Sequence, residues 1–323
     1  MRILRFLGSI LIVLAAARPE ALAQPVAFPD RPIKFIVPYG PGGTVDPTAR
    51  TLAARATELL GQPVVVENKP GAAGSIGTEF VVRAPADGYS VLIHTNVVAS
   101  EPWLKATLQY NFLRDMTPLL TIDETPFVVL VHPSLPVTSL KDLVAYVKER
   151  PGKLNYGASG IASSGHLRGE QFQLETGTRI QFVPYVDGGA TLRGLLANDI
   201  QIAFDTLPGS IANVQAGKLR LLAVGSEERW FLVPDTPTMK EQGFGALVSQ
   251  WIAAYVRSDT PPAIVDRLAR ALKEAAEDPK VKDQYRKLGF ETVGAGPAET
   301  AKRLREETEM WRKTIESAGI KAN

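Results

Sequence analysis

The chain has 323 residues, with 36 lysines and arginines against 34 aspartates and glutamates and a formal net charge of +2. This near balance gives no sign of binding to nucleic acid or to an anionic membrane surface. The sequence contains no cysteine, which excludes disulfides, thiol catalysis, cysteine-ligated metals and lipid attachment through cysteine. A chain of this length suits two domains of ordinary size, each stabilised by its core alone.

The first 23 residues have the pattern of a secretory signal. Two arginines precede a short apolar run over residues 6–17, and Ala21-Leu22-Ala23 forms a cleavage site. The run is too short to span a bilayer, which argues against a membrane anchor. We expect export and cleavage after Ala23. Cleavage removes three arginines and one glutamate, so that the 36 basic and 34 acidic residues both fall to 33.

Residues 33–50 are typical of a strand, a glycine-rich turn and a helix start. The strand covers residues 33–37, Asp46 is expected as the helix N-cap and Pro47 as the first helical residue, and Gly61 ends the helical spacing. The turn contains Tyr39, Gly40, Pro41, Gly42 and Gly43. Such a turn exposes backbone N–H groups at the positive end of a helix dipole, which can receive an anion without a charged side chain. The alternative is a tight turn without a ligand.

The same pattern repeats after Gly61. A strand near residues 64–68 leads to a second turn, a helix reaching about residue 84 and a strand over residues 89–94. The turn contains Gly71, Ala72, Ala73 and Gly74. Strands that alternate with helices predict βαβ units and a largely parallel sheet. Ligands bind at the carboxyl ends of such strands, where both turns and Thr95-Asn96 are expected to meet, although these two residues could instead cap the next helix.

The middle of the chain repeats this pattern with serines. A strand over residues 127–132, a helix opened by Ser139 and Asp142, and a strand over residues 154–158 lead to a helix that ends near residue 175. Before this helix stand Ser159, Ser163, Ser164 and His166. Their hydroxyls beside a helix N-terminus suit a carboxylate. Ser163, His166 and Asp205 also allow a serine-hydrolase alternative, which the missing nucleophile elbow disfavours.

Two acidic residues follow the next strands. Asp187, with Gly188 and Gly189, follows a strand over residues 181–185, and Asp205 follows a strand over residues 200–204. Each carboxylate is either a helix cap or a ligand contact. In a ligand cleft, Asp187 would repel a second carboxylate and accept an ammonium or hydroxyl group.

The last third of the chain continues the α/β pattern. Strands are expected over residues 220–224 and 251–256, and amphipathic helices over residues 261–276, 279–288 and 297–318. The three histidines lie on different elements with no ligand pair, so no metal site is expected.

Motifs along the whole expected mature chain resemble the Bug family of extracytoplasmic solute receptors, which serve tripartite tricarboxylate transporters. They include Val37-Pro38-Tyr39 with Pro41-Gly42-Gly43, Val65-Val66-Glu67-Asn68 with Pro70-Gly71-Ala72, Asp87-Gly88-Tyr89, Val183-Pro184-Tyr185 and Gly217-Lys218-Leu219-Arg220. The chain departs from the family at Val186-Asp187, where Lys-Gly is common, and at Ala190, where proline is usual. An Asp187 that faced the cleft would disfavour a polycarboxylate such as citrate.

The resemblance implies an α/β, two-lobed fold similar to type II periplasmic binding proteins, with a ligand cleft between the lobes. Residues 24–123 and 238–323 are expected to form the first domain and residues 124–237 the second. The resemblance also implies a periplasmic receptor, without cofactor or enzymatic activity, that hands a small organic acid to the membrane subunits of a transporter. A ligand sensor for a signalling kinase is the alternative, and we expect a monomer.

The expected ligand-binding residues come from the strand ends of both domains. They are Tyr39, Gly40, Pro41, Gly42, Gly43, Asp46, Gly71, Ala72, Ala73, Gly74, Thr95, Asn96, Ser159, Ser163, Ser164, His166, Asp187, Gly188, Gly189 and Asp205.

Overall fold

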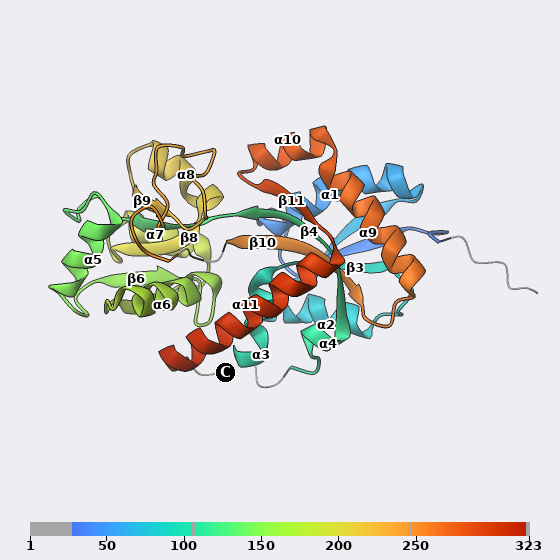
Figure 1. Ribbon diagram of the computed structural model, residues 1–323, viewed down its shortest axis with the longest axis horizontal. Helices are drawn as coiled ribbons and strands as arrows, with labels where there is room; N and C mark the ends of the chain where they lie inside the picture. Colours follow the sequence, from blue (N-terminus) through green and yellow to red (C-terminus); the bar gives the residue numbers. More distant parts are fainter. Residues whose placement is uncertain (1–27, 105–107, 246, 248, 321–323) are drawn as a thin grey trace, which may run out of the picture.

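The computed structural model describes residues 28–104, 108–245, 247 and 249–320. The expected signal peptide and its cleavage site lie outside these residues. Two sheets, each covered by helices, form two lobes that lie side by side (Figure 1). Within the described ranges, no helix has both the length and the apolar character needed to cross a bilayer.

The first lobe contains a six-stranded sheet with the order β11-β4-β10-β3-β1-β2. Its strands are β1 (Ile33–Val37), β2 (Val64–Asn68), β3 (Ser90–Thr95), β4 (Met116–Thr125), β10 (Gln250–Arg257) and β11 (Glu291–Ala295). β1 pairs in parallel with β2 and β3, whereas β10 is antiparallel to β3 and β4, and β11 is antiparallel to β4.

Helices cover both faces of this sheet. The helices are α1 (Val45–Leu60), η1 (Ala72–Gly74), α2 (Ser75–Arg83), η2 (Asn96–Ala99), α3 (Glu101–Leu104), α4 (Phe112–Asp115), α9 (Pro262–Glu277), α10 (Pro279–Lys287) and α11 (Pro297–Ala318). Phe35 packs in the core with α1, α9 and α10, and the next residue, Ile36, packs in the core with α2 and α11. The apolar run of β1 is therefore buried on both sides, as expected for a parallel strand between helical layers.

The second lobe contains a five-stranded sheet with the order β7-β6-β8-β5-β9. Its strands are β5 (Phe127–Val131), β6 (Asn155–Ala158), β7 (Gln181–Pro184), β8 (Ile202–Thr206) and β9 (Arg220–Val224), and its helices are α5 (Leu140–Lys148), α6 (Ser164–Thr176), α7 (Gly188–Leu196) and α8 (Leu207–Gln215). Residues of α5 and α6 pack in one core and residues of α7 and α8 in the other.

The chain passes between the lobes twice. β4 leads into β5 with only Pro126 between them, and the return reaches β10 at Gln250 (Figure 1). Both sheets are mixed rather than largely parallel, because β10 runs antiparallel to β3 and β4, and β5 runs antiparallel to β8 and β9. The strands next to the crossings thus account for the antiparallel pairs.

We infer that the return crossing lies later than the expected boundary at residues 237–238. Met239 and Leu247 are buried in the core of the second lobe, and Phe244 packs against it. Thr238 also forms a bridge with Val224 of β9. We therefore propose that the second lobe extends from residue 126 to about residue 247.

Candidate functional site

A cavity of about 700 Å³ lies between the lobes. The first lobe contributes Tyr39, Gly43, Thr44, Val45, Thr95, Val97 and Gln250. The second lobe contributes Phe127, Gly157, Ala158, Ser159, Ser163, Ser164, Gly165, Val186, Asp187, Gly188, Thr191, Phe204, Asp205 and Thr206. Most of these residues follow the carboxyl ends of β1, β3, β6, β7 and β8, which is where α/β sheets bind ligands.

The glycine-rich turn of the first lobe is held by a buried carboxylate. Asp46 accepts hydrogen bonds from the Gly42 N–H (3.2 Å), from Asn68 Nδ2 (2.9 Å) and from Arg50 Nε and Nη2 (3.0 and 2.9 Å). Asn68 Nδ2 also donates to the Tyr39 carbonyl oxygen (3.0 Å). Burial alone would raise the pKa of Asp46, but these hydrogen bonds outweigh it and lower the pKa. Asp46 therefore fixes the shape of the turn, and it lies outside the cavity lining.

The start of α1 differs from the expectation that Asp46 is its N-cap. The N-cap is Thr44, the helix begins at Val45, and no side chain caps it. Asp46 instead sits in the first turn, from which its carboxylate reaches back to Gly42. Gly61 ends the helix in the left-handed conformation (φ 71°), as predicted.

The Tyr39 side chain extends from the first turn toward the second, since a Cβ at Gly74 would lie 3.5 Å from the Tyr39 hydroxyl. Its hydroxyl lies 3.1 Å from Thr95 Oγ1 and 3.4 Å from His94 Nδ1, and burial raises its pKa. Gly74 has φ 96°, and a Cβ at this position would lie only 2.7 Å from His94 Nε2. The second turn therefore packs against Tyr39 and His94, and Gly71, Ala72 and Gly74 are not among the residues that line the cavity.

The N-terminus of α6 opens on the cavity from the second lobe. Ser163 is its N-cap and accepts a hydrogen bond from the His166 N–H (3.4 Å). Gly165 permits close packing here, because a Cβ would lie 2.8 Å from the Phe204 carbonyl oxygen. Ser159, Ser163 and Ser164 all line the cavity beside this helix end.

Asp187 both caps α7 and lines the cavity. Its Oδ1 accepts a hydrogen bond from the Ala190 N–H at 2.6 Å. The cap interpretation and the cleft interpretation of this residue are therefore compatible. Asp205, at the end of β8, also lines the cavity and accepts a hydrogen bond from the Thr206 N–H (2.8 Å). Burial raises the pKa of Asp205 to about 6, which leaves it mainly ionised at neutral pH.

The arrangement of His166 disfavours the hydrolase alternative. Its Nδ1 accepts a hydrogen bond from the Ala162 N–H (3.0 Å), and burial lowers its pKa to about 4. The Ser163 hydroxyl caps α6, and His166 is not among the residues that line the cavity. A serine nucleophile needs a base whose free nitrogen faces its hydroxyl, and neither residue is arranged for that role.

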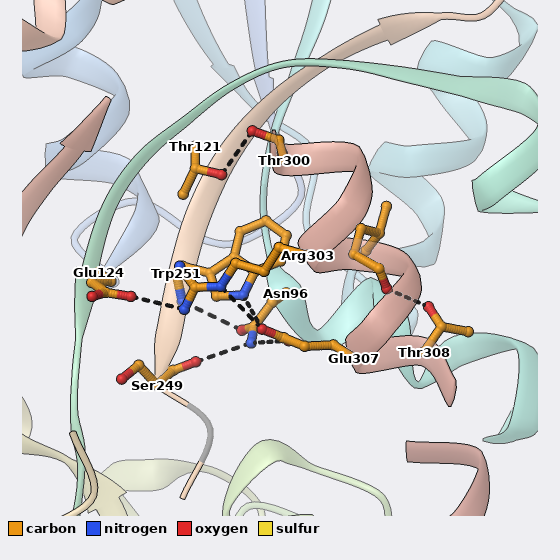
Figure 2. A network of polar contacts seen from close by, with 10 residues as sticks. Asn96, Thr121, Glu124, Ser249, Trp251, Thr300, Arg303, Glu307 and Thr308 are labelled. Carbon is orange, nitrogen blue, oxygen red and sulfur yellow. Dashed lines mark hydrogen bonds and ion pairs between the residues drawn. The ribbon is translucent and has the colours of Figure 1, made fainter. Parts of the chain in front are cut away.

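Asn96 belongs to a polar network (Figure 2) and is not among the residues that line the cavity. Its Nδ2 donates to the Ser249 carbonyl oxygen (3.0 Å) and to Glu307 Oε2 (2.8 Å). Trp251 Nε1 donates to the other carboxylate oxygen of Glu307, Oε1. Arg303 donates from Nε to Glu307 Oε1 (3.3 Å) and from Nη2 to Glu124 Oε2 (2.8 Å). Glu124 and Ser249 flank the two crossings, so this network connects the hinge strands to α11.

The structure brings only part of the expected set together. The expected residues that line the cavity are Tyr39, Gly43, Thr95, Ser159, Ser163, Ser164, Asp187, Gly188 and Asp205. The expected residues outside the lining are Gly40, Pro41, Gly42, Asp46, Gly71, Ala72, Gly74, Asn96, His166 and Gly189, and the side chain of Ala73 is outside the part that the structure describes.

Sequence reasoning missed several lining residues. Thr44, Thr191 and Thr206 are in or next to the expected turns, so extending each turn by a few residues would have found them. Phe127 and Gln250 begin the strands that follow the two crossings, and no local motif marks either one.

The described side chains of the cavity lining carry negative charge and no positive charge. Among its described residues none is lysine, arginine or histidine, and the charged side chains are Asp187 and Asp205. No group of three or more metal-ligating side chains occurs in the part of the chain that the structure describes. Hydrogen bonds that the lining donates to a ligand must therefore come from hydroxyls, amides and backbone N–H groups at helix ends.

Comparison with known proteins identifies the family. Residues 48–320 match the family described as the tripartite tricarboxylate transporter family receptor. Protein BugT of Bordetella pertussis is 34% identical over 324 residues, which is 99% of each chain. The solved structure of R. palustris Rpa4515 with adipate has a TM-score of 0.81 and 34% identity, and covers 92% of this chain and 100% of its own. MatC from Rhodopseudomonas palustris with bound malate has a TM-score of 0.75 and 26% identity, and covers 89% and 100%. The chain therefore belongs to the receptor family of tripartite tricarboxylate transporters, whose members are solute-binding proteins and not enzymes.

Proposed function

We propose that this receptor binds a small organic solute through a carboxylate in the cavity between its lobes and delivers it to the membrane subunits of the transporter. The adipate and malate bound by its structural neighbours are small carboxylates, which supports this ligand class. We also propose that the receptor works in the periplasm as a monomer after removal of the expected signal peptide.

The observation that carries the proposal is the convergence of helix starts on one cavity without a lining cation. The starts of α1, α6 and α7 contribute Val45, Ser164 and Gly188 to the lining. Helix N-termini attract anions through unpaired N–H groups and the helix dipole. Neutral donors orient a carboxylate without forming a buried ion pair, whose slow dissociation would oppose release to a transporter.

We propose that the lobes close on the ligand by bending at the two crossings. Hinge closure needs only a few residues that absorb the backbone rotation, and Pro126 and Ser249 lie at the two crossings. Arg168 of α6 lies over the rings of Phe127 and Trp311, at 4.5 and 4.3 Å from their centroids. This contact joins the second lobe to α11 of the first, and we propose it as the pivot.

A ligand screen tests the proposal. The melting temperature of the chain without residues 1–23 would be measured with monocarboxylates, dicarboxylates, tricarboxylates, amino acids and aromatic acids. The affinity of each compound that raises the melting temperature would then be measured by calorimetry. A ligand at 100 times its Kd stabilises the folded state by about 2.7 kcal/mol. We expect binding with the compound recovered unchanged and a smaller radius of gyration in solution scattering. A compound converted to product, or no binding in any class, would contradict the proposal.

A further inference from the structure

The start of α7 already holds an anion that belongs to the protein. Asp187 Oδ1 accepts the Ala190 N–H, and its carboxylate stands at the positive end of the helix. A carboxylate at this position compensates the helix dipole and uses one of the donors that a ligand carboxylate would need. This end of the cavity is therefore less favourable for a ligand anion than the start of α1, which has no side-chain cap.

A second carboxylate also lines the cavity. Asp205 lies near the end of β8 and Asp187 follows β7, and these two strands pair with β6 on its opposite sides. Arg193 on α7 is a cation near Asp187. A Cβ added at Gly189 would lie 3.3 Å from Asp187 Oδ1 and 3.4 Å from Arg193 Nη1, so both side-chain ends lie around the same point. Arg193 is not among the lining residues, so the charges that line the cavity are negative.

The opposite preference holds at the serine-rich and glycine-rich ends. Ser163, Ser164 and Gly165 of the second lobe, and Gly43 and Thr44 of the first, line the cavity with neutral groups at two helix starts. Such groups accept a carboxylate. The cavity thus offers neutral helix starts that accept an anion and, beside them at Asp187, a carboxylate that favours positive charge or a hydrogen-bond donor.

We propose that this receptor selects a monocarboxylate whose other end carries a hydrogen-bond donor, with an ammonium group preferred over a hydroxyl. Asp187 discriminates against ligands that carry a second carboxylate. The inference rests on the proposed function, because it assigns the ligand class of the same cleft. The carboxylate of the ligand lies at the starts of α6 and α1, and its donor group faces Asp187. A dicarboxylate of equal length places an anion against Asp187 and is disfavoured by like-charge repulsion.

Calorimetry with ligands of matched length tests the inference. The six-carbon set is 6-aminohexanoate, 6-hydroxyhexanoate, hexanoate and adipate, and the four-carbon set is 4-aminobutanoate, 4-hydroxybutanoate, butanoate and succinate. In at least one set, we expect the amino compound to bind about 10-fold or more tightly than the dicarboxylate, with the hydroxy compound between them. Since the preference is electrostatic, raising the salt concentration from about 0.05 to 0.5 M should reduce it.

Two variants identify the residue responsible. Asp187→Asn removes the charge but keeps an N-cap acceptor, since asparagine caps helices as well as aspartate. We expect this variant to lose most of the preference for the amino compound. Asp199→Asn removes an equal charge from an exposed position of the same lobe outside the cavity lining, and it should keep the preference. Circular dichroism and melting temperature would confirm that both variants are folded.

The outcomes separate this inference from the proposed function. If the unaltered protein binds the dicarboxylate as tightly as the amino compound, or if its preference is insensitive to salt and to Asp187→Asn, the inference is overturned while the receptor function stands. If neither set binds and the wider carboxylate screen also finds no ligand, both are overturned.

Discussion

Helices α1 and α7 both begin at the cleft after a strand and a turn, yet only α7 has a side-chain cap. At α1, the N-cap Thr44 makes no side-chain hydrogen bond to the helix, and the nearby carboxylate of Asp46 binds Gly42, Arg50 and Asn68 instead. At α7, Asp187 caps the helix and lies in the cavity. The same local pattern therefore leaves a helix start without a side-chain cap in one lobe and a helix start capped by a carboxylate in the other.

The difference depends on where the carboxylate lies relative to the helix start. An acid at the N-cap position accepts N–H groups of the first turn, as Asp187 does. An acid in the first turn can face backwards, as Asp46 does, and then it orders the preceding loop without occupying the helix end.

The largest effect, a loss of ligand affinity, is expected from blocking the start of α1 with a side chain. Gly43→Val would place a branched side chain in the cavity and should weaken carboxylate binding about 100-fold, or about 2.7 kcal/mol. A Cβ at Gly43 meets only the Gly40 carbonyl oxygen, at 3.5 Å, so the fold should persist. Titration calorimetry measures the affinity, and circular dichroism checks the fold.

Gly40→Val is the matched control in the same turn. A Cβ at Gly40 meets nothing within 4 Å, and Gly40 is outside the cavity lining. This variant should bind normally. Equal losses in both variants, or normal binding by Gly43→Val, would refute the assignment of the start of α1 to the ligand carboxylate.

A second test removes the carboxylate that orders the first turn. Asp46→Ala should lower the free energy of unfolding by about 2 kcal/mol at pH 7, because it leaves partners of a buried, charged hydrogen-bond network unsatisfied. The folded-state pKa of Asp46 is below its ordinary value of 3.8, so its contribution is present above that value and is lost as the pH falls through the lowered pKa.

Urea unfolding at pH 7 and at about pH 3 measures this effect. The deficit of Asp46→Ala should be smaller at the acidic pH, whereas Asp199→Ala, at an exposed position, should change stability little at either pH. A deficit that is independent of pH would show that packing, and not charge, gives Asp46 its role.

A smaller effect on stability and ligand affinity is expected from removing the serine that caps α6 in the second lobe. Ser163→Ala should cost about 1 kcal/mol of stability through loss of the α6 cap, and several-fold in affinity through loss of a hydroxyl that lines the cavity. Ser139→Ala removes the cap of α5, which does not line the cavity, and should cost similar stability with unchanged affinity. Chemical unfolding and calorimetry would compare them, and an unchanged affinity in Ser163→Ala would remove this serine from the proposed ligand contacts.

The last prediction concerns how the charge of Asp205 changes stability with pH. Burial raises its folded-state pKa from 3.8 to about 6, so this residue favours the folded state below about pH 4 and loses that contribution as the pH rises through 6. Asp205→Asn should therefore improve stability more at pH 8 than at pH 4, relative to the unaltered protein. Melting curves at both values measure the difference, and an equal effect at the two values would argue against a buried, titrating Asp205.

Much of the local structure could be predicted because short-range chemistry decides it. Gly61 ends α1 because glycine adopts the left-handed conformation readily, and Ser139 and Asp142 form a complete capping box at α5. The proline-initiated helices α9, α10 and α11 follow the amphipathic spacing of the last third of the chain. The family motifs supplied the two-lobed architecture and the receptor function, which are shown by the comparisons.

The cavity could be predicted only in part, because its composition depends on residues that are distant in sequence. The sequence by itself determined the α/β elements, the polar turns at strand ends and the acid that caps α7. Only the tertiary structure decided that Asn96 binds Ser249 and Glu307 outside the cavity lining, that Met239 and Leu247 pack in the core of the second lobe, that Thr206 and not Asp205 is the N-cap of α8, and that Gln250 lines the cleft. The physical reason is that caps and turns are formed by neighbours along the chain, whereas Asn96 and Ser249, 153 residues apart, meet only when the return strand β10 pairs with β3.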